Sequence, residues 1–278
     1  MNAPATDTAF AGSIPKLYET LLVPLIFQPY ADDLAARVAA RAPQRVLEVA
    51  AGTGVVTRRM AALLPEGTSI VATDLSQAML DQAATVGTPR PVRWQQADAM
   101  QLPFADGSVD AVVCQFGVMF FPDKAMAFAE ACRILAPGGT LYFNAWDRIA
   151  ENEFADTVMT ALQSVFPDDP PRFMARVPHG YNDLSMIAED LKRGGFGAAP
   201  EMVTVSARSR AASARTVAMA YCMGTPWRNE IEARDRTKLE AATNASERVL
   251  AARFGDGPVD GKIQAHVVVV RKAELAGR

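Results

Sequence analysis

The sequence predicts an α/β fold: a parallel, doubly wound sheet with helices on both faces. Three observations predict it. Short apolar runs alternate with helical patterns between residues 45 and 146. The first two runs, Arg45–Ala50 and Ser69–Asp74, are joined by a glycine turn and a helix, which makes a βαβ unit. An acid lies at or near the end of each run, and such units hold nucleoside-like ligands at the carboxyl ends of their strands.

The remaining elements follow from periodicity, caps and breakers. Asp32 or Asp33 caps a helix that Pro43 ends, and Ser76 and Asp123 cap later helices. We expect strands at 45–50, 69–74, 92–97, 109–116, 140–146, 202–207 and 264–270, and helices up to 42 and at 55–64, 77–86, 124–135, 150–166, 183–193, 216–223 and 231–254.

These elements suggest three segments. Residues 1–30 are a polar tail followed by an apolar flap that Pro24 and Pro29 break, and the flap is either a lid over the ligand or a segment packed on the core. Residues 31–150 are the ligand-binding core. Residues 151–278 are the C-terminal part of the same domain, with a helical insertion at about 208–258 as a candidate substrate cap.

Composition narrows the class of protein. The chain has 278 residues, half of them apolar, with a net charge of −3, so a sizeable core is expected and nucleic acid is a disfavoured partner. The three cysteines form no C-x-x-C pair, which is typical of buried thiols in a reducing compartment. We find no signal peptide and no apolar run of about 18 residues. We therefore expect a cytoplasmic protein without membrane insertion or metal, and leave a homodimer open.

The glycine turn indicates how a ligand is held. Gly52 and Gly54 let the backbone pass close to a ligand, and the following helix presents free N–H groups. Asp74, at the tip of the second strand, can accept hydrogen bonds from both hydroxyls of a ribose. This much is common to dinucleotide sites and to other nucleoside sites.

Three further features argue against a dinucleotide. Thr57 stands where the dinucleotide fingerprint has glycine or alanine. The carboxylate of Glu48, just before the turn, would repel a pyrophosphate and suits a cationic ligand instead. Asp98, followed by Ala99 and Met100 after the third strand, is suited to an adenine ring, with the acid for its exocyclic amine.

Together these segments resemble the class I S-adenosylmethionine-dependent methyltransferases, in particular the small-molecule group that includes quinone-ring C-methyltransferases. The resemblance covers residues 46–146. It comprises Val46–Gly54, Thr73–Ser76 with Met79, Gln96–Phe104, Phe104–Asp110 and Arg133–Gly139. Ala50 stands where the family usually has glycine, while Gly52 and Gly54 are kept.

The resemblance implies the fold and the roles of individual residues. It implies a Rossmann-like, seven-stranded, mostly parallel sheet whose last strand is antiparallel. It also implies an enzyme that transfers a methyl group from S-adenosylmethionine to a small molecule. The residues implied to bind the cofactor are Glu48, Ala50, Ala51, Gly52, Thr53, Gly54, Asp74, Leu75, Met79, Asp98, Ala99, Met100, Gln115 and Phe116.

The sequence defines the binding site of the methyl acceptor less closely than that of the cofactor. The apolar flap and the late insertion favour a small, hydrophobic or aromatic acceptor. His179, in a loop after the fifth strand, is the candidate base, whereas His266 in the last strand is expected to be structural. The candidates for contact with the acceptor are Tyr18, Phe27, Tyr30 and Tyr181.

Two other functions remain open at this point. One is a non-catalytic relative that binds S-adenosylmethionine or its product, because the family has no universal catalytic residue. The other is a nicotinamide-dependent oxidoreductase, against which Glu48, Thr57 and the Asp98 loop argue. Methylation of nucleic acid is not expected, because Gln115-Phe116-Gly117-Val118 stands where an Asn/Asp-Pro-Pro-aromatic tetrad would lie.

Overall fold

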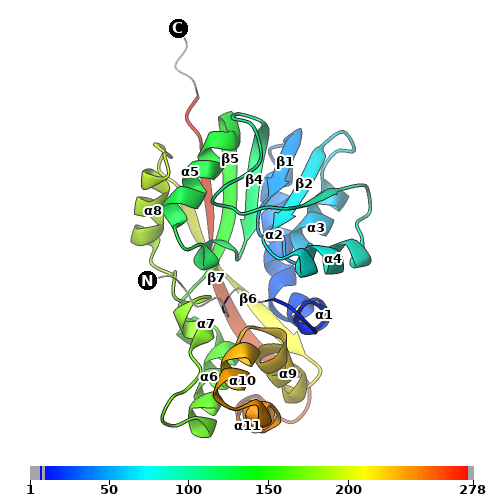
Figure 1. Cartoon of the computed structure of the whole chain (residues 1–278), viewed down its shortest axis with the longest axis vertical. Coiled ribbons are helices and arrows are strands. Elements are labelled where there is room, and N and C mark those ends of the chain that lie inside the picture. The colour runs from blue at the N-terminus through cyan, green and yellow to red at the C-terminus, as the bar shows by residue number, and fades with distance from the viewer. Residues whose placement is uncertain (1–6, 8–9, 275–278) are drawn as a thin grey trace. The chain divides into compact units, whose positions relative to one another are not determined.

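A seven-stranded sheet forms the centre of the fold in the computed structural model, which describes residue 7 and residues 10–274. The strand order is β3-β2-β1-β4-β5-β7-β6 (Figure 1). The strands are β1 (Arg45–Glu48), β2 (Ser69–Asp74), β3 (Arg93–Gln96), β4 (Val109–Gln115), β5 (Leu135–Trp146), β6 (Glu201–Ala211) and β7 (Val259–Arg271).

Most of the sheet is parallel and its last strand is not. Strands β1 to β5 pair in parallel. The backbone N–H of Lys272 donates to the carbonyl of Gly139, and that of Asp147 donates to the carbonyl of Gln264. Residue numbers therefore rise along β5 while they fall along β7, which makes this pair antiparallel. The predicted Rossmann-like sheet with an antiparallel last strand is confirmed.

The helices flank this sheet and fill the insertion between β6 and β7. The α-helices are α1 (Ile14–Leu17), α2 (Gln28–Ala39), α3 (Val55–Leu63), α4 (Gln77–Val86), α5 (Lys124–Ile134), α6 (Glu153–Val165), α7 (Phe173–Arg176), α8 (Leu184–Arg193), α9 (Ala214–Gly224), α10 (Trp227–Asp235) and α11 (Leu239–Phe254). A π-helical segment spans Tyr18–Phe27, and short 3₁₀ turns span Val118–Phe120, Ile149–Glu151 and Arg236–Lys238. Among the residues so described, no helix combines the length and apolarity that crossing a membrane requires.

The N-caps of α5 and α8 are the acids expected from the sequence, whereas the side-chain cap expected at Ser76 is not formed. The Asp123 carboxylate accepts the Met126 N–H at 2.9 Å, and Asp183 caps α8 in the same manner. Ser76 precedes α4 but makes no capping hydrogen bond through its side chain. Instead, its backbone N–H donates to Asp74, so the acid of the candidate site also orders the start of the helix.

The N-terminal helical region departs from the prediction. We expected Pro24 and Pro29 to interrupt the chain and an acid at 32 or 33 to cap a new helix. The chain is helical from Ile14 to Ala39 without a break. Pro24 lies inside the π-helical segment, where the wider turn accommodates its missing N–H. Pro29 lies directly after this segment, as the second residue of α2.

Several later elements are longer or differently divided than expected. Strands β6 and β7 run to 11 and 13 residues. The long helix expected at 231–254 is divided into α10 and α11 by a 3₁₀ turn that Asp235 caps. Strands β1 and β4 end earlier than expected, because Ala50 and Phe116 have left-handed φ angles of 53° and 50°.

The described residues divide into two compact units, each discontinuous in sequence. One unit comprises 1–28, 146–180 and 205–265, and the other comprises 29–145, 181–204 and 266–278. In the second unit, α5 and α8 pack side by side. In the first, α11 packs on α6 and α9, and the π-helical segment also packs on α9.

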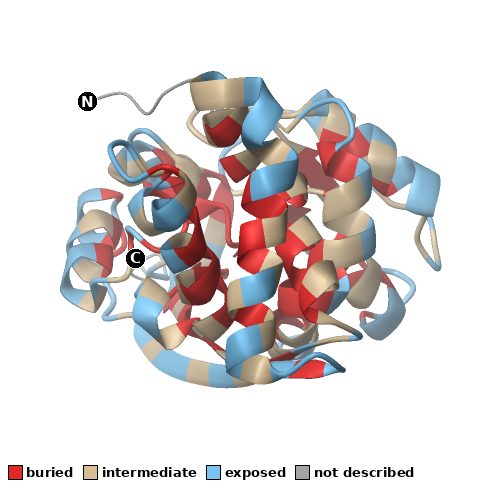
Figure 2. Cartoon of the chain, turned by 90° about the horizontal axis from the view of Figure 1, so that it is seen from below, coloured by how far each residue is buried: buried red, intermediate tan, exposed pale blue. Residues whose placement is uncertain are grey.

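Burial follows the apolar pattern of each element (Figure 2). Helices carry buried residues on one face and exposed residues on the other, as amphipathic helices do. Cys114 and Cys222 are buried as expected, whereas Cys132 is partly exposed. The edge strand β6 is exposed along much of its length.

Candidate functional site

The turn after β1 is built from left-handed residues and tied to the neighbouring strands. Ala50, Gly52 and Gly54 have φ angles of 53°, 57° and 82°. The N–H of Val49 donates to the Val113 carbonyl at 2.8 Å, and the N–H of Ala51 donates to the Thr73 carbonyl at 2.9 Å. The turn is thus fixed between β4 and β2, and its position at the carboxyl ends of these strands is where parallel sheets bind ligands.

Glu48 is a buried acid with a specific partner. Its side chain is 1% exposed, and its Oε2 accepts a hydrogen bond of 2.5 Å from the hydroxyl of Thr57 on α3. Burial raises the pKa of Glu48 to about 8, against the lowering effects of the Thr57 hydrogen bond and of the Arg58 charge. The carboxyl group is therefore largely protonated at neutral pH until a cation comes close to it.

Asp74 connects the turn to the next helix. Its Oδ2 accepts the N–H of Gly52 and its Oδ1 accepts the N–H of Ser76, both at 2.8 Å. Burial raises the pKa of Asp74, and these backbone hydrogen bonds lower it. Each carboxylate oxygen has a second acceptor position, so Asp74 can hold the turn and still accept ligand hydroxyls.

Gly54 has a packing role that we did not predict. A Cβ at this position would lie 2.7 Å from the indole of Trp94 and 3.3 Å from Ala83. Glycine is required here because the turn passes directly against β3 and α4, in addition to its left-handed φ. The sequence offered a signal in Trp94, a large side chain on an otherwise polar edge strand.

The predicted adenine-binding segments lie next to the tips of β2 and β3. Asp98 Oδ1 accepts the N–H of Met100 at 2.8 Å, which folds the loop back on itself. Leu75 is 57% exposed and thus offers a free apolar surface immediately after Asp74, whereas Met79 is buried. Ala99 and Met100 are half-buried.

At the end of β4 the chain makes a sharp, strained turn. Phe116 has a φ of 50° and is buried. Its N–H donates to the side-chain Oδ1 of Asn144 on β5 at 2.9 Å, and its ring meets that of Tyr30 edge-on at 5.3 Å. Gln115, one residue earlier, pairs in register with Asn144. We did not predict Asn144, although it is the one polar residue in the run Leu141–Trp146.

His179 lies in the first unit, at the end of a row of aromatic rings. The Phe27 ring stacks on Tyr18 at 4.8 Å and lies 6.1 Å from Trp146, whose ring is 5.9 Å from that of His179. His179 Nδ1 lies 2.7 Å from the carbonyl oxygen of Asp147. Burial lowers the pKa of His179 to about 4, so the imidazole is neutral at physiological pH and donates to that carbonyl.

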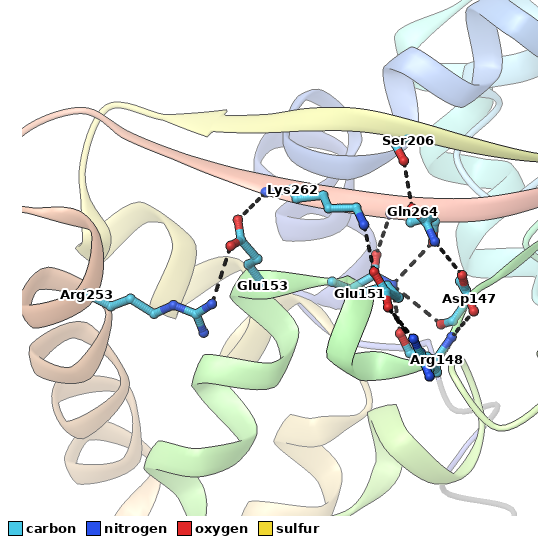
Figure 3. A network of polar contacts seen from close by, with 9 residues as sticks. Asp147, Arg148, Glu151, Glu153, Ser206, Arg253, Lys262 and Gln264 are labelled. Atoms are coloured by element: carbon cyan, nitrogen blue, oxygen red, sulfur yellow. Dashed lines mark hydrogen bonds and ion pairs between the residues drawn. The ribbon is translucent and has the colours of Figure 1, made fainter.

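A polar network surrounds the same stretch of chain after β5 (Figure 3). The Gln264 amide donates to Asp147 at 2.6 Å and accepts from Ser206 at 2.7 Å, and Asn152 exchanges hydrogen bonds with the Gln264 backbone. Charged side chains from the turn before α6, from α6 itself, from α11 and from β7 continue it: Arg148, Glu151, Glu153, Arg253 and Lys262. Its internal pairing indicates a structural role, which is to join the start of α6 to β7.

The predicted acceptor-contact residues fall into three groups. Tyr18 and Phe27 belong to the aromatic row with His179, and Tyr30 contacts Phe116. The Tyr181 hydroxyl donates to Asp190 at 2.9 Å, and Lys124 lies over its ring. Burial raises the pKa of Tyr181.

A cavity of about 330 Å³ lies elsewhere, at the start of β4 and β5. Its lining includes Asp110, the turn 136–139 before the straight part of β5, Tyr142 and two arginines, Arg41 and Arg271. None of the predicted site residues lines it. It opens at the amino-terminal edge of the sheet, opposite to the edge where the glycine turn lies.

The residues around the turn fit S-adenosylmethionine chemically. Glu48 is buried and Asp74 is partly buried, and loss of solvent raises the pKa of both acids, so a positive charge nearby would stabilise their ionised forms. The sulfonium and ammonium groups of S-adenosylmethionine would supply positive charge, and its ribose would supply hydroxyl donors. The buried Thr53 hydroxyl has no partner among the described residues, so a polar group of a ligand can satisfy it.

Known proteins resemble this chain most clearly in the same region. Residues 47–143 match the sequence profile of the family described as "Methyltransferase domain". Demethylmenaquinone methyltransferase from Deinococcus radiodurans is 36% identical over 135 residues, which cover 48% of this chain and 56% of that protein. The chain thus spans little more than half of this relative's length.

Solved structures extend the likeness of fold to almost the whole chain. The YcgJ protein from Bacillus subtilis gives a TM-score of 0.56 at 19% identity, covering 89% of this chain and 100% of its own. The [4+2]-cyclase SpnF gives 0.58 at 19% identity, covering 99% of both chains. With the matched profile and the geometry of the glycine turn, residues 47–143 are a class I methyltransferase domain, the kind that uses S-adenosylmethionine.

Proposed function

We propose that the protein transfers the methyl group of S-adenosylmethionine to a small, hydrophobic or aromatic molecule. The observation that carries the proposal is the pair of acids on either side of a turn with left-handed backbone, the buried Glu48 and the partly buried Asp74. A cation that also carries hydroxyl groups satisfies both acids at once. A pyrophosphate would instead meet two carboxylates, which disfavours a nicotinamide cofactor.

The cofactor supplies an activated methyl group on a sulfonium, and the chain contributes binding and alignment. In our proposal, Glu48 and the turn residues 50–54 face the methionine part, and Asp74 accepts the ribose hydroxyls. Leu75 and Met79 face the adenine, with Asp98, Ala99 and Met100 at its edge. Gln115 and Phe116 line the side that carries the methyl group.

Alignment and exclusion of water account for most of the rate in this proposal. An in-line displacement at a methyl group neutralises charge, so no oxyanion hole is required. A base is needed only for an acceptor that must lose a proton. His179 remains our candidate for contact with the acceptor, but its pKa of about 4 makes it a weak base at neutral pH.

An aromatic acceptor is supported by two observations. The named relative from Deinococcus radiodurans is a demethylmenaquinone methyltransferase, which by its name acts on a quinone-type ring. The predicted acceptor-contact residues Tyr18, Phe27 and Tyr30 are aromatic and largely buried. The experiment is turnover of methyl-labelled S-adenosylmethionine with a panel of quinols, phenols, amines and thiols. We expect label in ring products, and no label in any member of the panel would contradict the proposal.

A second candidate is a protein that binds the cofactor without methyl transfer. It is favoured by the full-length likeness of fold to SpnF, which is described as a [4+2]-cyclase rather than a methyltransferase. The two candidates differ in turnover and not in binding. Tight binding of S-adenosylhomocysteine, together with no labelled product from any acceptor in the panel, would favour this second function.

A further inference from the structure

Asn144 has one half of its amide engaged and the other half free. It lies on β5, is 0% exposed, and accepts the Phe116 N–H through Oδ1 at 2.9 Å. That bond fixes the orientation of the amide, because a reversed amide would place two donors together. Its Nδ2 has no hydrogen-bond partner among the described residues.

A buried donor without a partner is rare and calls for an explanation. Nearly all buried polar groups in native proteins are paired, because an unpaired donor loses its hydrogen bonds to water and gains none. The neighbours of Asn144 on β5, Phe143 and Ala145, are apolar and equally buried. An apolar residue would fit this strand without the cost, so the amide is accounted for by a partner that arrives with a ligand.

The place of Asn144 in the sheet indicates which ligand that is. The strand order β2-β1-β4-β5 puts Asp74 and Glu48 on the first two strands and Asn144 on the fourth. Adjacent strands lie about 4.8 Å apart, so β5 is roughly 10 Å from β1. A molecule bound to Asn144 therefore lies beyond the end of β4, on the side away from the ribose-binding acid.

The residue that the Asn144 amide holds belongs to an aromatic pair. Phe116, which the Oδ1 of Asn144 holds in its left-handed conformation, is 6% exposed and meets Tyr30 edge-on. Strained residues of this kind persist only where the surrounding structure fixes them, and they cluster at functional sites. A buried amide donor bonded to the backbone of Phe116, whose ring meets that of Tyr30, suits a flat apolar ring that carries an oxygen atom.

We propose that the Nδ2 of Asn144 donates a hydrogen bond to a ring oxygen of the methyl acceptor, which is a phenol, quinol or related oxygenated ring. The inference rests on the proposed function and defines its substrate class. Asn144 binds the acceptor through Nδ2, and it positions Phe116 through Oδ1. An oxygen-free ring of the same size leaves the amide unpaired and binds less tightly.

The test uses ¹⁵N-labelled protein loaded with S-adenosylhomocysteine and two ring probes, 2-naphthol and 2-methylnaphthalene. The probes differ only by a hydroxyl in place of a methyl group. The side-chain amide signals of Asn144 are assigned by their loss in Asn144→Asp. We expect 2-naphthol to shift these signals, 2-methylnaphthalene to leave them in place, and wild-type protein to prefer 2-naphthol by about 10-fold.

Two variants separate binding from folding. Asn144→Ala removes both halves of the amide, and Asn144→Asp keeps an oxygen for the Phe116 N–H while removing the donor. In each folded variant the preference for 2-naphthol should fall to near one. Asn144→Asp, which keeps the oxygen that holds Phe116, should retain its affinity for S-adenosylhomocysteine. If Asn144→Ala does not fold, Asn144→Asp alone decides.

Two results would overturn the inference. One is a shift of the Asn144 amide signals on addition of S-adenosylhomocysteine alone, which would assign the donor to the cofactor. The other is an undiminished preference for 2-naphthol in Asn144→Asp. A wild-type protein that fails to bind S-adenosylhomocysteine at all would instead contradict the proposed function, so the two failures are distinguishable.

Discussion

The Thr57 hydroxyl on α3 donates a 2.5 Å hydrogen bond to the buried carboxyl group of Glu48 at the end of β1. Glu48 precedes the glycine turn and Thr57 follows it, so this bond links the end of β1 to the start of α3. It also explains Thr57, which stands where a dinucleotide site has a smaller residue. In this chain residue 57 supplies a hydroxyl donor to Glu48, the acid that we propose lies near the positive charge of the cofactor.

Replacing Thr57 with valine tests that bond at nearly constant volume. We expect the free energy of unfolding to fall by about 1–2 kcal/mol, because Glu48 loses its donor while it remains buried. The pKa of Glu48 should rise further, which weakens binding of S-adenosylmethionine at pH 7. Chemical denaturation and calorimetry measure the two effects.

The matched control is Thr68→Val. Thr68 is also buried and donates to the Pro43 carbonyl at 3.0 Å, and it precedes the start of β2, whereas Asp74 lies at the other end of that strand. It should cost similar stability and leave the affinity for the cofactor unchanged. Equal loss of affinity in both variants would mean that Thr57 has no specific role in the site.

The raised pKa of Glu48 predicts how stability depends on pH. The unfolded chain loses this proton near its ordinary pKa of 4.5, whereas the folded protein keeps it up to about 8. Over that window the folded state binds more protons, so stability is full below pH 4.5 and falls as pH rises towards 8, by at most about 1.4 kcal/mol per pH unit.

Glu48→Gln should remove most of this slope, as measured by urea denaturation of the ligand-free protein from pH 5 to 9. Asp74, whose pKa is also raised, contributes a remaining slope of the same sign. A cation favours the ionised acid, so cofactor affinity in the wild-type protein should increase with pH up to about 8. Identical pH profiles for wild-type and Glu48→Gln would show that Glu48 ionises normally.

Gly54→Ala tests the contact between the turn and Trp94. The new methyl group would meet the indole at 2.7 Å and require a φ of 82° from a non-glycine residue. We expect a loss of about 2–4 kcal/mol, the sum of strain and overpacking. In a Trp94→Leu background the indole is absent, so Gly54→Ala should cost only the strain, about 1–2 kcal/mol. Thermal denaturation of Gly54→Ala in both backgrounds gives the difference, and equal losses would exclude the steric contact with Trp94.

His179 should not titrate in the neutral range. Its pKa of about 4 predicts a turnover rate with no inflection near pH 6.5, once a substrate is found. Folding stability should be full above pH 6.5 and decline as pH falls towards 4, because the unfolded chain takes up the proton first. A rate profile with an inflection near 6.5 that disappears in His179→Ala would contradict the burial of a neutral imidazole.

Periodicity predicted much of the fold, and its failures have physical causes. The βαβ unit from 45 to 74 and the caps at Asp123 and Asp183 rest on local chemistry, which a single sequence carries. Pro24 and Pro29 predict breaks, yet the helix continues through both, with Pro24 inside a π-helical segment and Pro29 directly after it.

In the candidate site, too, residues of one short segment were predicted and a residue that depends on a long-range contact was not. Glu48, Asp74 and the glycines were predicted because their chemistry is concentrated in one short unit. Asn144 was missed because its role depends on a hydrogen bond to Phe116, which lies 28 residues away in sequence. Contacts of that range follow from strand order and register, and a single sequence leaves both open.

Isothermal titration calorimetry of S-adenosylhomocysteine binding at pH 8 is the decisive test of the proposed cofactor site. We expect saturable one-to-one binding to the wild-type protein and no detectable binding of NAD⁺. We also expect loss of binding in Asp74→Ala, with the fold retained by circular dichroism. Asp74→Ala that binds as tightly as wild type, or a wild-type protein that binds NAD⁺ in preference, would contradict the proposed site.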